Sequence, residues 1–182
     1  MKRLHYTFLT LTILWMAVIF IFSSQTGDTS SNTSGTIVNF IVSIFVPDFD
    51  GYNATKQQDI LDIITLIIRK GAHFTEYAIL GFLSFFTTIT YMLKKSALGL
   101  KEKYGELFRL KRIIYGLASL IFTCLYAISD ELHQGFVADR SPAVLDVVVD
   151  TCGGLAGILV ACVCSSLYIH SISKKIKGSK NP

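Results

Sequence analysis

Apolar residues form four long runs along the chain, separated by polar segments. Runs 4–22, 113–133 and 143–169 are each long enough to cross a bilayer, since a helical span needs about 20 apolar residues. The remaining run has a shorter continuous apolar part, so we place its span at 73–93. The pattern predicts an all-α fold, a polytopic membrane helical bundle with four transmembrane helices.

The first run could also be read as a cleaved signal peptide. Its apolar stretch is longer than the core of a typical signal, and residues 21–25 lack a small-x-small cleavage site. We therefore expect an uncleaved span.

The segment after the first run predicts one or two short amphipathic helices in an outer loop. Residues 25–35 are rich in Ser, Thr, Asn and Gly, which is typical of a loop. Apolar positions then recur at helical spacing over 37–45 and again over 54–69, with a turn at 48–53. The first stretch is too short to span and suits a helix lying on a membrane surface, while the second is expected to pack against the membrane or the bundle.

The last run carries a helix start signal and a set of small residues. Ser141 and Pro142 suit the N-cap and the first helical position. Gly153, Gly154 and Gly157 lie on roughly one face, where small residues let a neighbouring helix approach closely.

Composition agrees with a single membrane domain covering 1–182. Hydrophobic residues make up 51% of the chain and charged residues 16%, whereas soluble domains carry about 25% charge. The basic residues flank apolar runs, so we expect the lipid bilayer as a partner and no nucleic acid. All four cysteines lie within apolar runs, which favours packing over disulfides.

Lys and Arg are concentrated in three places. Thirteen of the 17 lie at the N-terminus, in the 94–112 loop and in the 170–182 tail. The positive-inside rule then places both termini and this loop in the cytoplasm of a multi-pass cell-membrane protein. Residues 23–69 and 134–142 are expected outside.

Ionisable residues from three predicted spans meet at this outer end. Spacings of three and four residues put them on shared helix faces. The candidate catalytic residues are His73, Glu76, Asp130, Glu131 and His133. The candidate substrate-binding residues are Lys70, Gln134, Arg140, Asp146 and Asp150. Asp150 lies about two turns into its span, so it should face the bundle interior and have a partner.

Three interpretations of this cluster stay open. It could be an outward-facing site in which a His acts as acid or base while Arg140 and Lys70 hold a phosphate or carboxylate. It could be a buried ion-pair network that only fixes helix packing. It could bind Zn²⁺ or Mn²⁺. No recognised ligand spacing is present, so we expect no metal site and no cofactor, with a divalent metal as the less favoured alternative.

Several motifs together resemble the VanZ family of small bacterial membrane proteins. They are residues 22–25 (FSSQ), 69–77 (RKGAHFTEY) and 129–134 (SDELHQ), together with Arg140, Asp146 and Asp150. The resemblance covers about residues 5–165. It implies a cell-envelope role linked to glycopeptide resistance, teicoplanin in particular, with a lipid-linked cell-wall precursor or a glycopeptide as partner. It implies no particular reaction or oligomeric state, so an enzyme and a non-catalytic membrane-binding or envelope-organising protein both stay open.

The chain departs from the family pattern just before Arg140. Where the family usually has Pro-Gly, this chain has Ala138-Asp139. We expect the turn to differ in shape, and Asp139 to be able to pair with Arg140 and weaken its hold on an anion.

Overall fold

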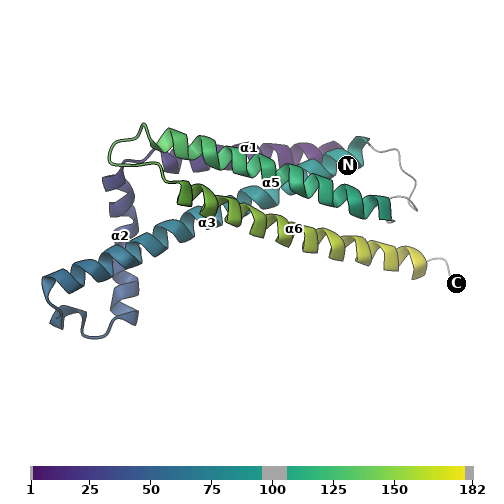
Figure 1. Cartoon of the computed structure of the whole chain (residues 1–182). Coiled ribbons are helices and arrows are strands. Elements are labelled where there is room, and N and C mark those ends of the chain that lie inside the picture. The colour runs from purple at the N-terminus through teal and green to yellow at the C-terminus, as the bar shows by residue number, and fades with distance from the viewer. Residues whose placement is uncertain (1, 96–105, 179–182) are drawn as a thin grey trace.

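A computed structural model of the chain describes the backbone of residues 2–95 and 106–178, and the side chains of 3–27, 35–92 and 110–167. Within these residues the fold is all-helical, as predicted (Figure 1). The elements are α1 (Lys2–Ser23), α2 (Gly27–Phe45), the 3₁₀ turn η1 (Phe49–Gly51), α3 (Ala54–Lys95), α5 (Glu106–Gln134) and α6 (Val144–Gly178).

Helices α1, α3, α5 and α6 lie side by side in a bundle, with α3 in contact with every other helix (Figure 1). The C-terminal ends of α1 and α5 and the start of α6 lie together, and we call this the site end. The starts of α1 and α5 and the far end of α6 lie at the opposite end. This alternation brings residues 130–150 beside the middle of α3.

Three of the described helical segments are long and apolar enough to cross a membrane, namely Arg3–Ser23, Leu110–Gln134 and Val144–Leu167. Their outward faces expose apolar side chains such as Ile13, Ile121 and Val163, as lipid contact requires. Residues 73–93 are not among these segments, so the prediction of four spans is confirmed only for three. All four cysteines are free, and Cys124 and Cys162 are partly buried whereas Cys152 and Cys164 are exposed.

Helix α3 joins two elements that the sequence predicted as separate. The amphipathic helix 54–69 and the span 73–93, which follows it directly in the sequence, form one helix of 42 residues. Gly71 is a poor helix former, but a single Gly costs only about 1 kcal/mol, which packing on both sides offsets. A helix of this length measures about 63 Å, roughly twice a hydrocarbon core, and its first half projects beyond the bundle (Figure 1).

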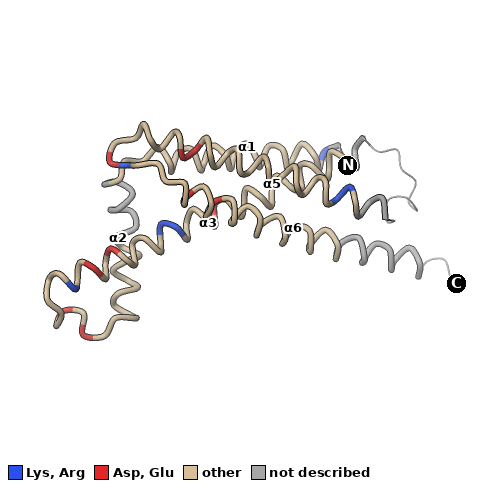
Figure 2. Tube along the Cα trace, in the orientation of Figure 1, with Lys and Arg blue, Asp and Glu red and all other residues tan. Residues whose placement is uncertain are grey.

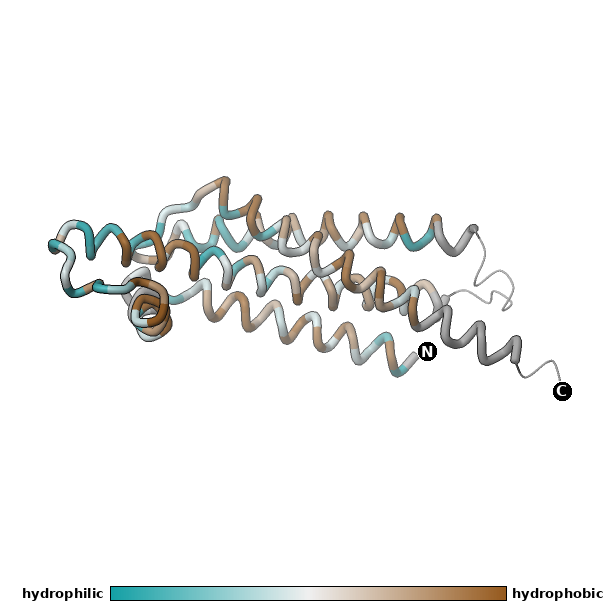
Figure 3. The backbone as a smooth tube through the Cα atoms, turned by 90° about the horizontal axis from the view of Figure 1, so that it is seen from below, coloured by the Kyte–Doolittle hydropathy of each residue, from teal (hydrophilic) through white to brown (hydrophobic). Residues whose placement is uncertain are grey.

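Helix α2 begins eight residues earlier than Gly35, so the predicted loop over 25–35 is wrong. Burial of Val38 and Val42 anchors the apolar half, and the helix extends from it because adding a residue is easier than starting a new helix. The helix crosses the bundle axis at a steep angle and is seen nearly end-on in Figure 3. Phe40 and Phe45 are exposed on it, which agrees with the predicted surface-lying helix.

Helices α5 and α6 extend into the predicted basic loop and tail. Helix α5 starts at Glu106, which makes 106–112 helical, while 96–105 lie outside the described residues. Helix α6 continues to Gly178, so most of the 170–182 tail is helical, and 179–182 lie outside the described residues.

Helix α6 starts at Val144, so Ser141 and Pro142 are not its N-cap and first residue. The predicted side-chain cap is replaced by a partner from another helix. The backbone N–H of Ala143 donates a hydrogen bond of 2.6 Å to Oε1 of Glu131 on α5. A carboxylate there also suits the positive end of the helix dipole.

The glycines of α6 make the close contacts predicted for them. A Cβ on Gly157 would meet the backbone of Ala78, and one on Gly153 would meet the backbone of Phe74, both on α3. A Cβ on Gly154 would meet Thr123 on α5. Asp150, one turn before this line, is thereby held where α3, α5 and α6 meet.

Candidate functional site

A polar pocket of about 250 Å³ opens at the site end between α3, the start of α6 and the loop that joins α5 to α6. Three of its lining residues are cationic, three are acidic and one is a histidine. They are Arg69, Lys70 and Arg140, then Asp139, Asp146 and Asp150, and His73. The sequence predicted that five of these seven belong to one site.

A chain of hydrogen bonds runs inward from the pocket. Arg140 Nη1 donates to Gln134 Oε1 at 2.8 Å, and Gln134 Nε2 donates to Asp130 Oδ2 at 3.2 Å. Ser23 at the end of α1 donates to the same oxygen at 2.8 Å. Ser23 is a site residue that the spacing argument missed, although it belongs to the FSSQ motif.

The cations of the pocket differ in their partners. Lys70 forms an ion pair with Asp146. Arg140 bonds Gln134 rather than an acid, and its expected pairing with Asp139 is not among the ion pairs of the described residues. Burial, followed by repulsion from Arg69, lowers the pKa of Arg140 below its ordinary value. The guanidinium still stays protonated, so its charge remains available to a ligand.

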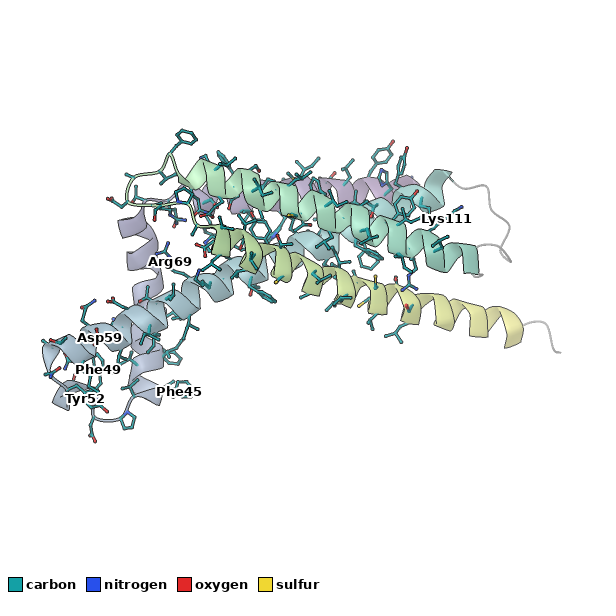
Figure 4. The ribbon with its side chains drawn as sticks, viewed as in Figure 1. Phe45, Phe49, Tyr52, Asp59, Arg69 and Lys111 are labelled. Atoms are coloured by element: carbon teal, nitrogen blue, oxygen red, sulfur yellow. The ribbon has the colours of Figure 1, made fainter. Side chains whose placement is uncertain are left out.

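Arg69 is the second site residue that sequence reasoning missed. It lines the pocket beside Lys70, and Figure 4 shows it on α3 near α2, away from Lys111 at the opposite end. The signal that could have found it is its place directly before Lys70, at the lip of the predicted span.

The deepest part of the site brings together three helices. Ligating atoms of His73 on α3, Asp130 on α5 and Asp150 on α6 all lie within 4.8 Å of one another. Asp150 is only 1% exposed and faces the interior as predicted. The predicted partner is not found among the described residues, where neither oxygen of Asp150 has a hydrogen bond. Glu76 lies beside His73, with 3.8 Å between Oε2 and Nδ1.

Two predicted catalytic candidates lie outside this group. The ring of His133 packs on Phe20, with centroids 4.5 Å apart, and its Nδ1 is buried without a partner. Glu131 is occupied by Ala143 at the start of α6. Both share a helix with Asp130, but neither lines the pocket.

The turn before Arg140 contains Ala138-Asp139, where the family usually has Pro-Gly, and its backbone conformation shows how Asp139 fits there. Asp139 has a φ of 59°, in the left-handed region that favours glycine. Asp tolerates this conformation better than most residues. Gly27 donates its N–H to Ala138 O at 3.3 Å, and its Cα is packed so closely that a Cβ would meet Asp139. The start of α2 thus fixes the turn that carries Arg140.

Charge is distributed unevenly along the bundle. Figure 2 shows that the acidic residues of the described chain lie toward the site end and the projecting α2–α3 hairpin. Cations and acids that meet in a partly closed pocket can bind an anion, exchange protons or hold a metal ion.

Comparison with protein families identifies one match. The family model described as VanZ/LLP1 matches residues 8–165, which confirms the resemblance drawn from the motifs. Neither the curated proteins nor the solved structures gave a match.

Proposed function

The chain belongs to the VanZ/LLP1 family, and from this premise we propose that its pocket binds the anionic headgroup of a lipid-linked cell-envelope molecule at the outer face of the cell membrane. The observation that carries the proposal is the position of Arg69, Lys70 and Arg140 around one 250 Å³ pocket. Phosphate and carboxylate groups are the anions that such a set recognises.

The guanidinium of Arg140 is the principal anion contact. Its hydrogen bond to the neutral Gln134 holds the side chain in place without neutralising it. Lys70, by contrast, is already paired with Asp146. A phosphate or carboxylate entering the pocket therefore gains most from Arg140.

The proposal includes four spans and an outward-facing site end. Residues 73–93 form the fourth span, because they pack within the bundle between three span-like helices. Orientation follows from the Lys and Arg counts, which place the opposite end in the cytoplasm. The amphipathic α2 then lies in the outer interface, where lipid headgroups are found.

Acid–base chemistry on the bound molecule is the second candidate function. His73 lines the pocket and has Glu76 beside it, so this pair, rather than His133, is the acid–base candidate. A non-catalytic role with a purely structural ion-pair network is the alternative, and the Lys70–Asp146 pair supports it. A Glu76→Gln variant separates the catalytic role from the structural one. Only the acid–base role needs that carboxylate to convert the bound molecule.

The binding proposal is tested by titrating the detergent-solubilised full chain with dioctanoyl phosphatidic acid. The chain has one tryptophan, and Trp15 Nε1 donates to the backbone of Glu76 at 2.8 Å, so its fluorescence reports on the site end. We expect saturable binding, with dioctanoylglycerol as the matched ligand that lacks a phosphate. Equal responses to the two lipids would contradict the proposal.

Arg140→Gln should weaken this binding about tenfold or more, the equivalent of about 1.4 kcal/mol for one charged contact. Arg112→Gln is the matched control, since Arg112 is at the opposite end and donates to Cys162 O. If both variants bind as the unmodified chain does, Arg140 is not the anion contact.

Orientation and cellular role need separate measurements. Phe136, in the α5–α6 loop, is 90% exposed, so a Phe136→Cys variant should react with an impermeant maleimide in intact cells above the background of the four native cysteines. Reaction only after lysis would reverse the orientation. The proposed role in glycopeptide resistance predicts greater teicoplanin tolerance in cells that express the chain.

A further inference from the structure

Asp150 poses a problem that anion binding does not solve. The carboxylate is 1% exposed, neither oxygen has a hydrogen bond, and the residue lies within a segment long and apolar enough to cross a membrane. A buried charge needs a partner, because removal from water costs several kcal/mol. Although Arg69 lines the same pocket, no ion pair of the described residues includes Asp150. Lys70 pairs with Asp146, and Arg140 bonds Gln134.

Two further side chains near Asp150 each have an atom that is free to bind a cation. The hydrogen bonds from Ser23 and Gln134 both reach Oδ2 of Asp130, which leaves Oδ1 available. The Nδ1 atom of His73 is buried and also lacks a hydrogen bond. Two carboxylates and an imidazole therefore converge from three different helices, although no bond among them holds them there.

We propose that His73, Asp130 and Asp150 bind a divalent metal ion, Mn²⁺ or Zn²⁺, in the floor of the pocket. Their ligating atoms lie within 4.8 Å of one another. Ligating atoms around a tetrahedral zinc ion are about 3.3–3.6 Å apart, given metal–ligand distances of about 2.0–2.2 Å. Side-chain shifts of about an ångström complete the site.

The surroundings also suit a metal. Oε2 of Glu76 lies 3.8 Å from Nδ1 of His73, too far for a hydrogen bond, so that ring nitrogen is not occupied by Glu76. The gain is electrostatic as well, because a divalent cation neutralises both buried aspartates at once. Three protein ligands leave a coordination position free, as in metal sites that bind a further ligand. His73 and Asp150 line the pocket, so this position faces the space beside Arg140.

No ligand spacing in the sequence marks this site, so a divalent metal was the less favoured alternative. The three ligands are separated by 57 and 20 positions in the chain, so no local ligand spacing exists, and we therefore expected no cofactor. The inference goes beyond the proposed anion binding and does not depend on it, since metal binding is measured with no lipid present.

The test uses the full chain with a tag that contains no histidine, purified without chelator from cells supplied with Mn²⁺ and Zn²⁺. Elemental analysis should find about one equivalent of one of these metals. EDTA should remove it and lower the melting temperature, and titration with MnCl₂ or ZnCl₂ should restore it. Less than about one-tenth of an equivalent, with no response of the stripped protein to either salt, overturns the proposal.

Asp150→Asn and His73→Gln should each reduce the bound metal at least about tenfold, given the usual loss from removing a ligand or its support. Asp146→Asn is the matched control, because Asp146 lies one turn before Asp150 on the same helix and pairs with Lys70. It should keep the metal. Without metal, Asp150→Asn should melt no lower than the unmodified chain, since it removes an unpaired buried charge.

Three outcomes separate this proposal from the others. Normal metal content in Asp150→Asn shows that the ion binds elsewhere and overturns the assignment. Loss of lipid binding in Arg140→Gln with metal retained leaves the metal site intact. A metal-bound His73 does not titrate as a free base, so an activity profile governed by that histidine in the metal-loaded protein also contradicts the site.

Discussion

The two ends of the bundle bury polar groups in different ways. At the opposite end the polar groups are mainly hydroxyls that bond the backbone of their own helix or each other, such as Thr12 with Thr87 at 2.9 Å and Thr88 with Ser119 at 3.0 Å. They surround an apolar core that includes Phe85 and Ile158. At the site end the buried polar residues are Ser23, Asp130, Glu131, Gln134 and Asp150, three of which carry carboxyl groups.

The ends also differ in how well their polar groups are satisfied. Eight buried side-chain atoms in the described residues lack a hydrogen bond, and seven of them belong to residues 73–77 or 133–151. The exception is Nε of Arg112. Packing alone would not concentrate unsatisfied groups at one end, because each costs about 1–3 kcal/mol. The difference is the one we expect if, as proposed, the site end binds a ligand and the opposite end contributes mainly to stability.

The largest effect is expected where one substitution damages both ends. Gly157→Ala places a methyl group against the backbone of Ala78 and forces α6 away from α3. We expect a loss of about 3 kcal/mol and a melting temperature lower by about 6–12 °C, with lipid binding also reduced. Gly116→Ala is the control, since its Cβ meets Ile158 and Phe85 at the ordinary distances of 3.8 and 3.9 Å. Equal melting temperatures for the two variants would contradict the close α3–α6 contact.

Substitutions of Glu131 test whether every acidic residue at the site end is needed to bind a ligand. Glu131→Met removes the acceptor of the Ala143 N–H and should lower stability by about 2 kcal/mol, because the bond is charged and buried. Glu131→Gln keeps an acceptor oxygen and should recover most of that loss. Neither variant should change metal content. Thermal melts combined with elemental analysis check this, and metal loss in Glu131→Gln would give Glu131 a role that we do not assign to it.

A smaller effect is expected at the opposite end. Thr88→Val keeps the side-chain shape and removes the hydroxyl that meets Ser119 on α5. Hydrogen bonds between membrane helices contribute about 0.6 kcal/mol on average. The melting temperature should therefore fall by about 2 °C while phosphatidic acid binding is unchanged. A change in lipid affinity would show that the two ends are not independent.

The smallest expected effect is a gain in stability. Asp139→Gly relieves the positive φ of the turn and should raise stability by about 0.5 kcal/mol, offset in part by the greater freedom of Gly in the unfolded chain. Asp139→Ala, which lacks the tolerance of Asp for this conformation, should instead lower stability. A denaturant titration measures both, and the reverse order would contradict the left-handed turn.

The difference between the ends also explains how far the sequence could be read. Apolar length alone predicted α1, α5 and α6, because hydrocarbon imposes a strict minimum on a span. Helical spacing predicted that His73, Asp130 and Asp150 share one end, and the structure brings them together. Helical spacing could not predict that the His133 ring packs on Phe20. Residues that share a helix face with Asp130 can still contact a different neighbouring helix.

The errors share a physical cause, which is packing between segments far apart in the chain. Residues 27–35 read as a loop because their propensity is poor, but the apolar half of α2 anchors the helix. Ser141 read as an N-cap, but the donor it would serve is satisfied by Glu131 from another helix. Asp150 was expected to have a partner among the side chains, and no local pattern could show that none is provided.

The most direct test of the central claim is thermal unfolding of Arg140→Gln, without ligand, beside Arg112→Gln. If the site end serves a ligand, Arg140→Gln should melt within about 2 °C of the unmodified chain although it binds phosphatidic acid at least about tenfold more weakly. If its charges form a structural network instead, the melting temperature of Arg140→Gln should fall well below that of Arg112→Gln. That result would contradict the account.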